Sequence, residues 1–176
     1  MLYSHASELA IRAALYLALQ PPGKLTPVYE IAQGTGLRGP YLAKIMRRLI
    51  RARLVRGFRG PGGGVELGRP PEGISLWSVV RAMEGPAQAE LCLLGLRDCS
   101  PLRPCPLHQQ WTLLRAEIQR LLEGTTLASL GQGLRETTEL GPESWLAVGA
   151  EAARRTPWDG EKGNGGRRDR ERRRPS

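Results

Sequence analysis

Three cysteines and one histidine are crowded into a short segment of this chain. Six residues separate Cys92 from Cys99, five separate Cys99 from Cys105, and two separate Cys105 from His108. Thiolate and imidazole are ligands of tetrahedral zinc and of iron–sulfur clusters. Zinc sites usually contain cysteine pairs two to four residues apart, whereas the longer spacers here suit a larger, bridged group. The spacing leaves an iron–sulfur cluster, zinc and free structural thiols open, and the odd number of cysteines argues against a disulfide framework.

The residues that precede this segment predict a helix-turn-helix. We expect a first helix over residues 4–19, a second over residues 27–33 and a third over residues 40–53. The turn Gly34-Thr35-Gly36 separates the second helix from the third. Apolar residues at helical spacing predict the buried stripe of the third helix, which consists of Leu42, Ile45, Met46 and Leu49.

A β-hairpin is expected directly after the third helix. Residues 55–58 and 65–67 are β-prone and flank the glycine-rich segment 59–64. A phosphate-binding nucleotide loop is the competing interpretation of the glycines. It fails because no Lys-Ser/Thr pair follows and no helix begins after them. The pattern therefore predicts a wing with a flexible tip.

The second half of the chain predicts three more helices. Residues 75–84 form one, with Gly85 as its stop, and residues 126–134 form a short cap helix. Between them, apolar residues recur at spacings of four, three, four and three, at Leu107, Trp111, Leu114, Ile118 and Leu121. This stripe fits a dimerisation helix, which we favour because readers of DNA half-sites are usually dimers, or a helix packed on its own domain.

Basic residues are concentrated between residues 38 and 59. This block holds no acidic residue and eight basic ones, namely Arg38, Lys44, Arg47, Arg48, Arg51, Arg53, Arg56 and Arg59. The simplest alternative is a helix face that only contacts solvent. In that case eight like charges would repel one another without any compensating partner, so we favour binding to double-stranded DNA. RNA is less favoured because no aromatic stacking platform accompanies the charge.

Each residue of this block has an expected role on DNA. Lys44, Arg47 and Arg51 lie opposite the apolar stripe and are expected in the major groove. Arg38 and Tyr41, with Lys44, lie at the N-terminal end of the helix, where bases are met in helix-turn-helix docking. The wing residue Arg59 is expected in the minor groove. Two flanking arginines, Arg48 and Arg53, are expected to face phosphates.

Composition sets the broad class of the protein. The 176 residues carry a formal charge of +9 and are 40% hydrophobic, which supports a folded core. We find neither an apolar run long enough for a membrane span nor a secretory leader, so we expect a cytoplasmic protein with no membrane partner. The predicted fold class is mainly α, a winged helix-turn-helix plus a long dimerisation helix and a disordered tail. The expected divisions are 1–70 (DNA-binding domain), 71–105 (linking helix and cysteine loop), 106–136 (dimerisation and cap helices) and 137–176 (disordered basic tail).

These motifs together resemble one family, the IscR/NsrR-type (Rrf family) winged-helix transcriptional regulators, over residues 1–135. The similarity lies in the three-cysteine loop and in four further segments, which are Glu8-Leu-Ala-Ile-Arg12, Tyr41-Leu42, Arg59-Gly-Pro-Gly-Gly-Gly64 and Thr126-Leu-Ala-Ser-Leu130. Any one of these motifs is weak, but their combination is specific.

The resemblance implies a homodimer that binds palindromic promoter DNA with an affinity controlled by an iron–sulfur cluster. In such proteins the cysteines that match Cys92, Cys99 and Cys105 hold the cluster. A histidine placed like His108 is the fourth ligand in IscR-like members, whereas an acidic residue placed like Glu8 of the partner subunit serves in others. We expect His108 here, and a 2Fe–2S cluster in preference to a 4Fe–4S cluster.

Two other function classes compete with this interpretation. The chain could be an iron–sulfur carrier or electron-transfer module that lacks sequence-specific DNA binding, or a zinc- or thiol-based winged-helix regulator. An enzyme is rejected, because the sequence has only two histidines and no base pattern that would activate a cysteine nucleophile.

Overall fold

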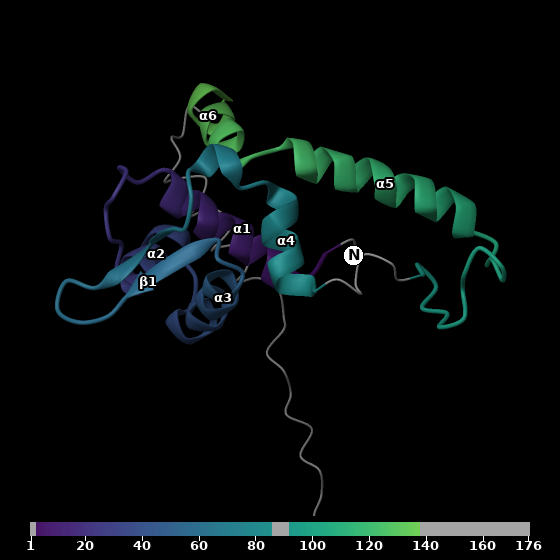
Figure 1. The fold of residues 1–176 in the computed structure, drawn as a ribbon, viewed down its shortest axis with the longest axis horizontal. Coiled ribbons are helices and arrows are strands. Elements are labelled where there is room, and N and C mark those ends of the chain that lie inside the picture. The colour runs from purple at the N-terminus through teal and green to yellow at the C-terminus, as the bar shows by residue number, and fades with distance from the viewer. Residues whose placement is uncertain (1–2, 86–91, 138–176) are drawn as a thin grey trace, which may run out of the picture.

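The computed structural model describes residues 3–85 and 92–137, which fold into six α-helices and one small β-hairpin (Figure 1). The predicted tail lies outside the described residues, apart from Thr137. The elements are α1 (His5–Ala18), α2 (Val28–Thr35), α3 (Gly39–Arg51), β1 (Val55–Phe58), β2 (Gly64–Leu67), the 3-10 turn η1 (Pro71–Gly73), α4 (Leu76–Glu84), α5 (His108–Gly124) and α6 (Leu127–Thr137).

Helix α1 forms the centre of the core. The hydroxyl of Ser4 accepts a hydrogen bond from the backbone N–H of Ser7 and so caps the helix. Small and large apolar residues of α1, including Ala10, Ala13 and Leu15, are completely buried. Helices α2, α3, α4 and α6 contact α1 from different sides, as Figure 1 shows around its central position. One hydrophobic core therefore joins residues from both ends of the described chain.

The third helix begins and ends close to its predicted bounds. All four residues of its predicted stripe are buried, Leu42, Ile45, Met46 and Leu49. The helix ends at Arg51, two residues before the predicted end. Arg53 adopts a left-handed conformation with φ of 57°. Its N–H donates to the carbonyl of Ile50, and the N–H of Leu54 donates to the carbonyl of Leu49. These two bonds form a Schellman motif, which ends a helix and usually uses glycine.

The wing is a two-stranded antiparallel hairpin, in which Val55 pairs with Leu67 and Phe58 with Gly64. It is attached to the helical core through Thr26, which exchanges two backbone hydrogen bonds of 2.9 Å with Val65. This third segment fixes the root of the hairpin, because an isolated pair of strands is marginally stable.

Helices α5 and α6 behave differently although they are neighbours in sequence. Leu127 and Leu134 of α6 are buried in the common core, so α6 folds back on α1 as a cap. By contrast, α5 extends away from the other helices and has no buried residue (Figure 1). Its apolar stripe remains accessible within the single chain. The domain boundaries drawn from the sequence stay a prediction.

No helix in the described ranges combines the length and the apolar character that crossing a lipid bilayer requires.

Candidate metal centre and nucleic-acid interface

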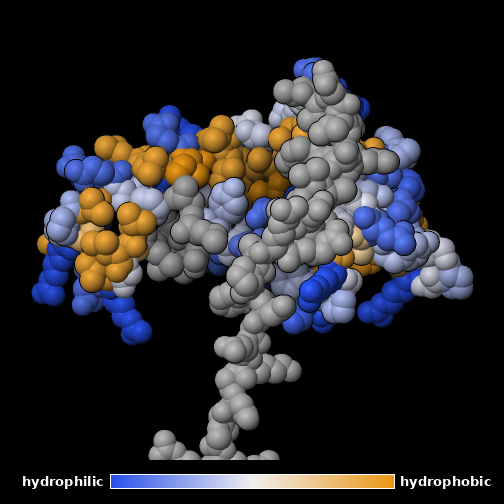
Figure 2. Space-filling view, turned by 180° about the vertical axis from the view of Figure 1, so that it is seen from behind, coloured by the Kyte–Doolittle hydropathy of each residue, from blue (hydrophilic) through white to orange (hydrophobic). Residues whose placement is uncertain are grey.

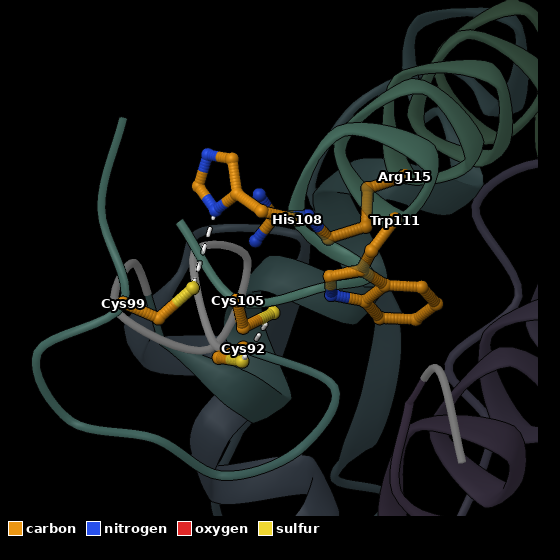
Figure 3. A pocket seen from close by; sticks show the side chains of 6 residues that line it. All are labelled: Cys92, Cys99, Cys105, His108, Trp111 and Arg115. Carbon is orange, nitrogen blue, oxygen red and sulfur yellow. Dashed lines mark hydrogen bonds between the residues drawn. The ribbon is translucent and has the colours of Figure 1, made fainter. Parts of the chain in front are cut away.

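The three cysteine thiols converge at the start of α5. The Sγ atoms of Cys92, Cys99 and Cys105 all lie within 4.8 Å of one another, and those of Cys92 and Cys105 are 3.7 Å apart (Figure 3). With a metal–sulfur bond of about 2.3 Å, two thiolates on one tetrahedral ion are separated by roughly 3.8 Å. The donor set therefore fits a thiolate-ligated metal, either a single ion or an iron of a cluster.

Tight turns bring these thiols together from a segment without regular secondary structure. The N–H of Gly95 bonds to the Cys92 carbonyl, and the N–H of Cys99 bonds to that of Leu96. A third turn joins Cys105 to His108, whose N–H bonds to the Cys105 carbonyl at 3.0 Å. Since α5 begins at His108, the turn places the third thiol directly at the N-terminal end of that helix.

The histidine approaches only one of the three thiols. Its Nδ1 atom lies 3.2 Å from Cys99 Sγ, but His108 is not part of the group whose ligand atoms are all within 4.8 Å (Figure 3). The alternative ligand Glu8 lies elsewhere on its own chain, with its carboxylate 3.1 Å from His5 and 3.9 Å from Arg12. The structure thus brings together three of the four predicted ligands and places the fourth beside them.

Two residues that the sequence did not indicate as part of this site also line it. Trp111 and Arg115 border the small cavity of about 20 Å³ next to the thiols, with the guanidinium 6.0 Å from the centre of the indole ring (Figure 3). They follow His108 by three and seven residues, so all three lie on one face of α5. That spacing is the signal by which the sequence could have indicated them.

The thiols are not equivalent in acidity. Burial raises the pKa of Cys92, but hydrogen bonds from the backbone at Leu94 and Leu96 outweigh it, so the net shift is downward. A backbone hydrogen bond at Cys105 favours the thiolate of Cys99, yet burial and the neighbouring thiols outweigh it and raise the pKa of Cys99. Since the thiolate is the metal ligand, the lowered pKa of Cys92 favours its ligating form.

The predicted DNA face of α3 is open. Lys44, Arg47 and Arg51 are exposed on the side opposite the buried stripe, and Tyr41 is 38% exposed at the start of the helix. Arg38 directly precedes the helix, and Arg59 lies at the exposed tip of the wing. Within residues 3–85 and 92–137, no carboxylate forms an ion pair with any of these basic residues.

Two other arginines of the basic block are engaged within the protein. Arg48, which we expected to face phosphates, donates a hydrogen bond of 2.7 Å to the carbonyl of Met83 in α4. Arg56 in β1 pairs with Glu66 in β2 at 3.0 Å. Met83 is distant from Arg48 in sequence, and Glu66 lies on the strand opposite Arg56. A count of charges along the sequence therefore does not reveal either contact.

Comparison with known proteins identifies the fold. The profile of the Rrf2 family, described as iron-dependent transcriptional regulators, matches residues 3–133. The chain belongs to the Rrf2 family. A helix-turn-helix-type transcriptional regulator of Aquifex aeolicus is 34% identical over 132 residues, which cover 74% of this chain and 91% of that protein. The transcriptional regulator IscR of Aliivibrio salmonicida is 32% identical over 121 residues, covering 69% and 71%.

Among solved structures, CymR, the global cysteine regulator of B. subtilis, has 28% identity and a TM-score of 0.62, covering 73% of this chain and 95% of its own. As a member of the Rrf2 family, the protein is a DNA-binding winged-helix transcriptional regulator, and its relatives are regulators rather than enzymes. The thiol triad, together with IscR-like relatives, indicates binding of a metal or an iron–sulfur cluster.

Proposed function

We propose that this Rrf2-type protein acts as a homodimer whose affinity for promoter DNA is controlled by an iron–sulfur cluster on Cys92, Cys99, Cys105 and His108. The observation that carries the proposal is the convergence of three thiols on a winged-helix regulator. An electron-transfer module would use the exposed cations of α3 to dock an acidic partner protein, but the relatives of this chain are transcriptional regulators, so DNA is the favoured partner.

The proposed roles of the cluster and of its ligands follow from the types of donor atom present. A bound cluster supplies redox and ligand-exchange chemistry that thiols alone lack. The three cysteines would hold it as thiolates, and His108 would complete the set from the first turn of α5. Arg115 adds a positive charge to the wall of the cavity.

Support for the homodimer comes from the surface of α5. Leu107, Leu114 and Leu121, three residues of the predicted stripe, are 40%, 49% and 67% exposed. Figure 2 shows hydrophobic side chains gathered along α5 and over the adjoining cysteine loop. Exposed apolar surface of this kind marks an interaction site. A second copy of the chain would cover the stripe with the same stripe of its own α5.

Control of DNA binding would operate through the position of the cysteine loop. The loop lies between α4, which packs on the DNA-binding unit, and α5, the proposed dimer helix. A change in the loop therefore alters the separation of the two copies of α3, the proposed recognition helix, in a dimer. Couplings of this type are typically about 1–3 kcal/mol, which corresponds to roughly 5–150-fold in affinity.

The experiment that tests the proposal is anaerobic purification of the full chain, followed by absorbance spectroscopy and assays of iron, sulfide and zinc. We expect a coloured protein that contains iron and sulfide. Cys99→Ala should lose both, whereas Leu102→Ala, at a 93% exposed position of the same loop, should retain them. A colourless protein with stoichiometric zinc and no sulfide would contradict the cluster.

The fourth ligand is tested in the same preparation. We expect His108→Ala to alter the absorbance spectrum and to reduce the cluster content, whereas Glu8→Gln should leave both unchanged. The opposite result would assign the fourth position to Glu8 of the partner subunit.

A single zinc ion is the second candidate, favoured by one specific observation. All three Sγ atoms lie within 4.8 Å of one another, close to the roughly 3.8 Å expected for thiolates on one tetrahedral ion, whereas the cysteines of a cluster are divided between its irons. The protein would then be a zinc- or thiol-based winged-helix regulator. The metal and sulfide assays decide between the two forms.

A further inference from the structure

Three helices, α1, α3 and α4, meet at the C-terminal end of α4. The guanidinium of Arg48, on α3, donates to the carbonyl of Met83 at 2.7 Å. The carboxylate of the next residue, Glu84, accepts hydrogen bonds from the backbone N–H of Ser4 at 2.8 Å and from the hydroxyl of Ser7 at 2.5 Å, and also one from the Ser4 hydroxyl. We call these five residues the α4 junction.

Arg48 occupies a different side of α3 from the open cations. With about 100° of rotation per residue, it lies roughly 120° from the centre of the buried stripe, whereas Lys44 and Arg51 lie nearly opposite that stripe. It is thus on the flank that faces α4. The last carbonyls of a helix lack intrahelical partners and carry partial negative charge, so the end of α4 is a suitable acceptor for a guanidinium.

Glu84 holds the other side of the junction. Burial opposes its charge, but hydrogen bonds from Ser4 and Ser7 and the nearby Arg48 outweigh it and lower the pKa of Glu84. The ionised carboxylate therefore joins the first turn of α1 to the last turn of α4. The helix ends immediately after it, at Gly85, which has a φ of 78°.

We propose that Arg48 is a positioning residue for sequence-specific DNA binding and not a phosphate contact. Its bond to Met83 sets the orientation of the recognition helix relative to the end of α4. Since the chain continues from this end toward Cys92, displacement of the cysteine loop passes to α3 through the same bond. This last step rests on the proposed function, whereas the positioning role does not.

The two possible roles of Arg48 predict different effects on binding. Loss of a phosphate contact weakens binding to all sequences alike and lowers the salt slope, the decrease of log K with log salt concentration, by about 0.9 per contact. Loss of a positioning bond weakens binding to the cognate sequence, because base contacts depend on the orientation of the helix. It leaves non-specific binding and the salt slope almost unchanged.

The test measures the affinity of full-length Arg48→Met for a cognate promoter duplex and for an unrelated duplex at several salt concentrations. We expect a loss of at least about fivefold in the ratio of the two affinities, with an unchanged salt slope. Arg81→Met is the matched control, because Arg81 is an exposed arginine of α4 outside the junction. A slope lower by about 1.8 for the dimer, with the ratio unchanged, would overturn the proposal; so would no effect at all.

A second variant covers the case in which Arg48→Met does not fold. Glu84→Gln keeps all the cations of α3 and loosens the same junction, so the specificity ratio should again fall with an unchanged salt slope. Glu72→Gln removes an exposed carboxylate outside the junction and should behave like the wild type. An unchanged ratio in Glu84→Gln would contradict the positioning role.

Repeating the measurement before and after anaerobic reconstitution with iron and sulfide separates the two proposals. If the wild type binds DNA equally in both forms, the proposed cluster control fails, while the salt-slope result still decides the role of Arg48. If the wild type responds and Arg48→Met retains the whole response, transmission through Arg48 is excluded. Loss of the response in the variant supports it.

Discussion

Replacement of Gly34 by alanine tests the packing that positions the recognition helix. Gly34 is part of α2 and faces Tyr16 of α1, and a Cβ atom there would lie 2.1 Å from Cε2 and 2.8 Å from Cζ of the ring. Carbon atoms in contact are normally about 3.5–4.0 Å apart. Tyr16 is only 9% exposed, so its ring has little room to move away. Helix α2 would therefore be displaced from α1.

The size of the effect follows from two opposing contributions. Overpacking of a core costs typically about 1–3 kcal/mol, whereas alanine is preferred over glycine in a helix by about 1 kcal/mol. Gly133→Ala in α6 isolates the second contribution, because a Cβ atom there has no neighbour within 4 Å. We expect Gly133→Ala to raise the melting temperature. The free energy of unfolding of Gly34→Ala should be about 1–3 kcal/mol lower than that of Gly133→Ala. For a chain of this size that difference is about 2–12 °C.

Thermal unfolding followed by circular dichroism measures the stability of both variants, and promoter binding reports whether the displaced α2 also moves α3, which it contacts. Tyr16→Leu removes the ring atoms that the added Cβ atom would contact, so Gly34→Ala should be less damaging in a Tyr16→Leu background than in the wild type. Equal melting temperatures for Gly34→Ala and Gly133→Ala, or strict additivity with Tyr16→Leu, would refute this account of the packing.

Three further predictions concern charged residues. Arg51→Met should lower the salt slope of DNA binding by about 0.9 per subunit, whereas Arg56→Met should change it less because Arg56 pairs with Glu66; equal changes would contradict the assignment. Arg53→Gly should raise the melting temperature by relieving a left-handed conformation that costs about 1 kcal/mol, and a lower melting temperature would count against this. Hydrogen bonds and a nearby arginine lower the folded-state pKa of Glu84 against the effect of burial. The stabilisation that the ionised Glu84 contributes is thus fully present above the carboxyl pKa of the unfolded chain, about 4.3. It is lost as the pH falls through the lower pKa that Glu84 has in the folded protein. Melting curves should show Glu84→Gln less stable than the wild type at neutral pH and equally stable in acid; a pH-independent difference would exclude this origin.

The sequence predicts most of the helices and the wing because their signals are local. Helical spacing alone identifies the stripe of α3, since its four residues face the core whatever they contact. The serine caps at Ser4 and Ser75 are likewise local, as each hydroxyl bonds to an N–H three residues later. The early end of α3 was not predictable, because Arg53 adopts the left-handed conformation in place of the usual glycine.

Contacts between distant residues explain the rest. The cysteine spacing indicates a group of ligands, but the distance between any two thiols depends on turns that composition does not specify. The burial of Leu127 depends on how α6 returns to α1. Arg48 and Met83 are 35 residues apart, and no periodicity links them. The sequence therefore indicates what chemistry a side chain can perform, but not which distant residue it contacts.

The partners that basic residues have within the protein also limit how strongly DNA binding can depend on salt concentration. The basic block contains eight cations, and the structure engages two of them, Arg48 and Arg56, with residues of other elements, whereas Arg47 donates only to the Ala43 carbonyl of its own helix α3. Six cations per subunit remain for phosphates, so the salt slope of a dimer is at most about 11, where eight would permit about 14. A measured slope above about 11 would require basic residues outside residues 38–59. The nine basic residues of 151–176 would then be the first source to test, by truncation of that segment.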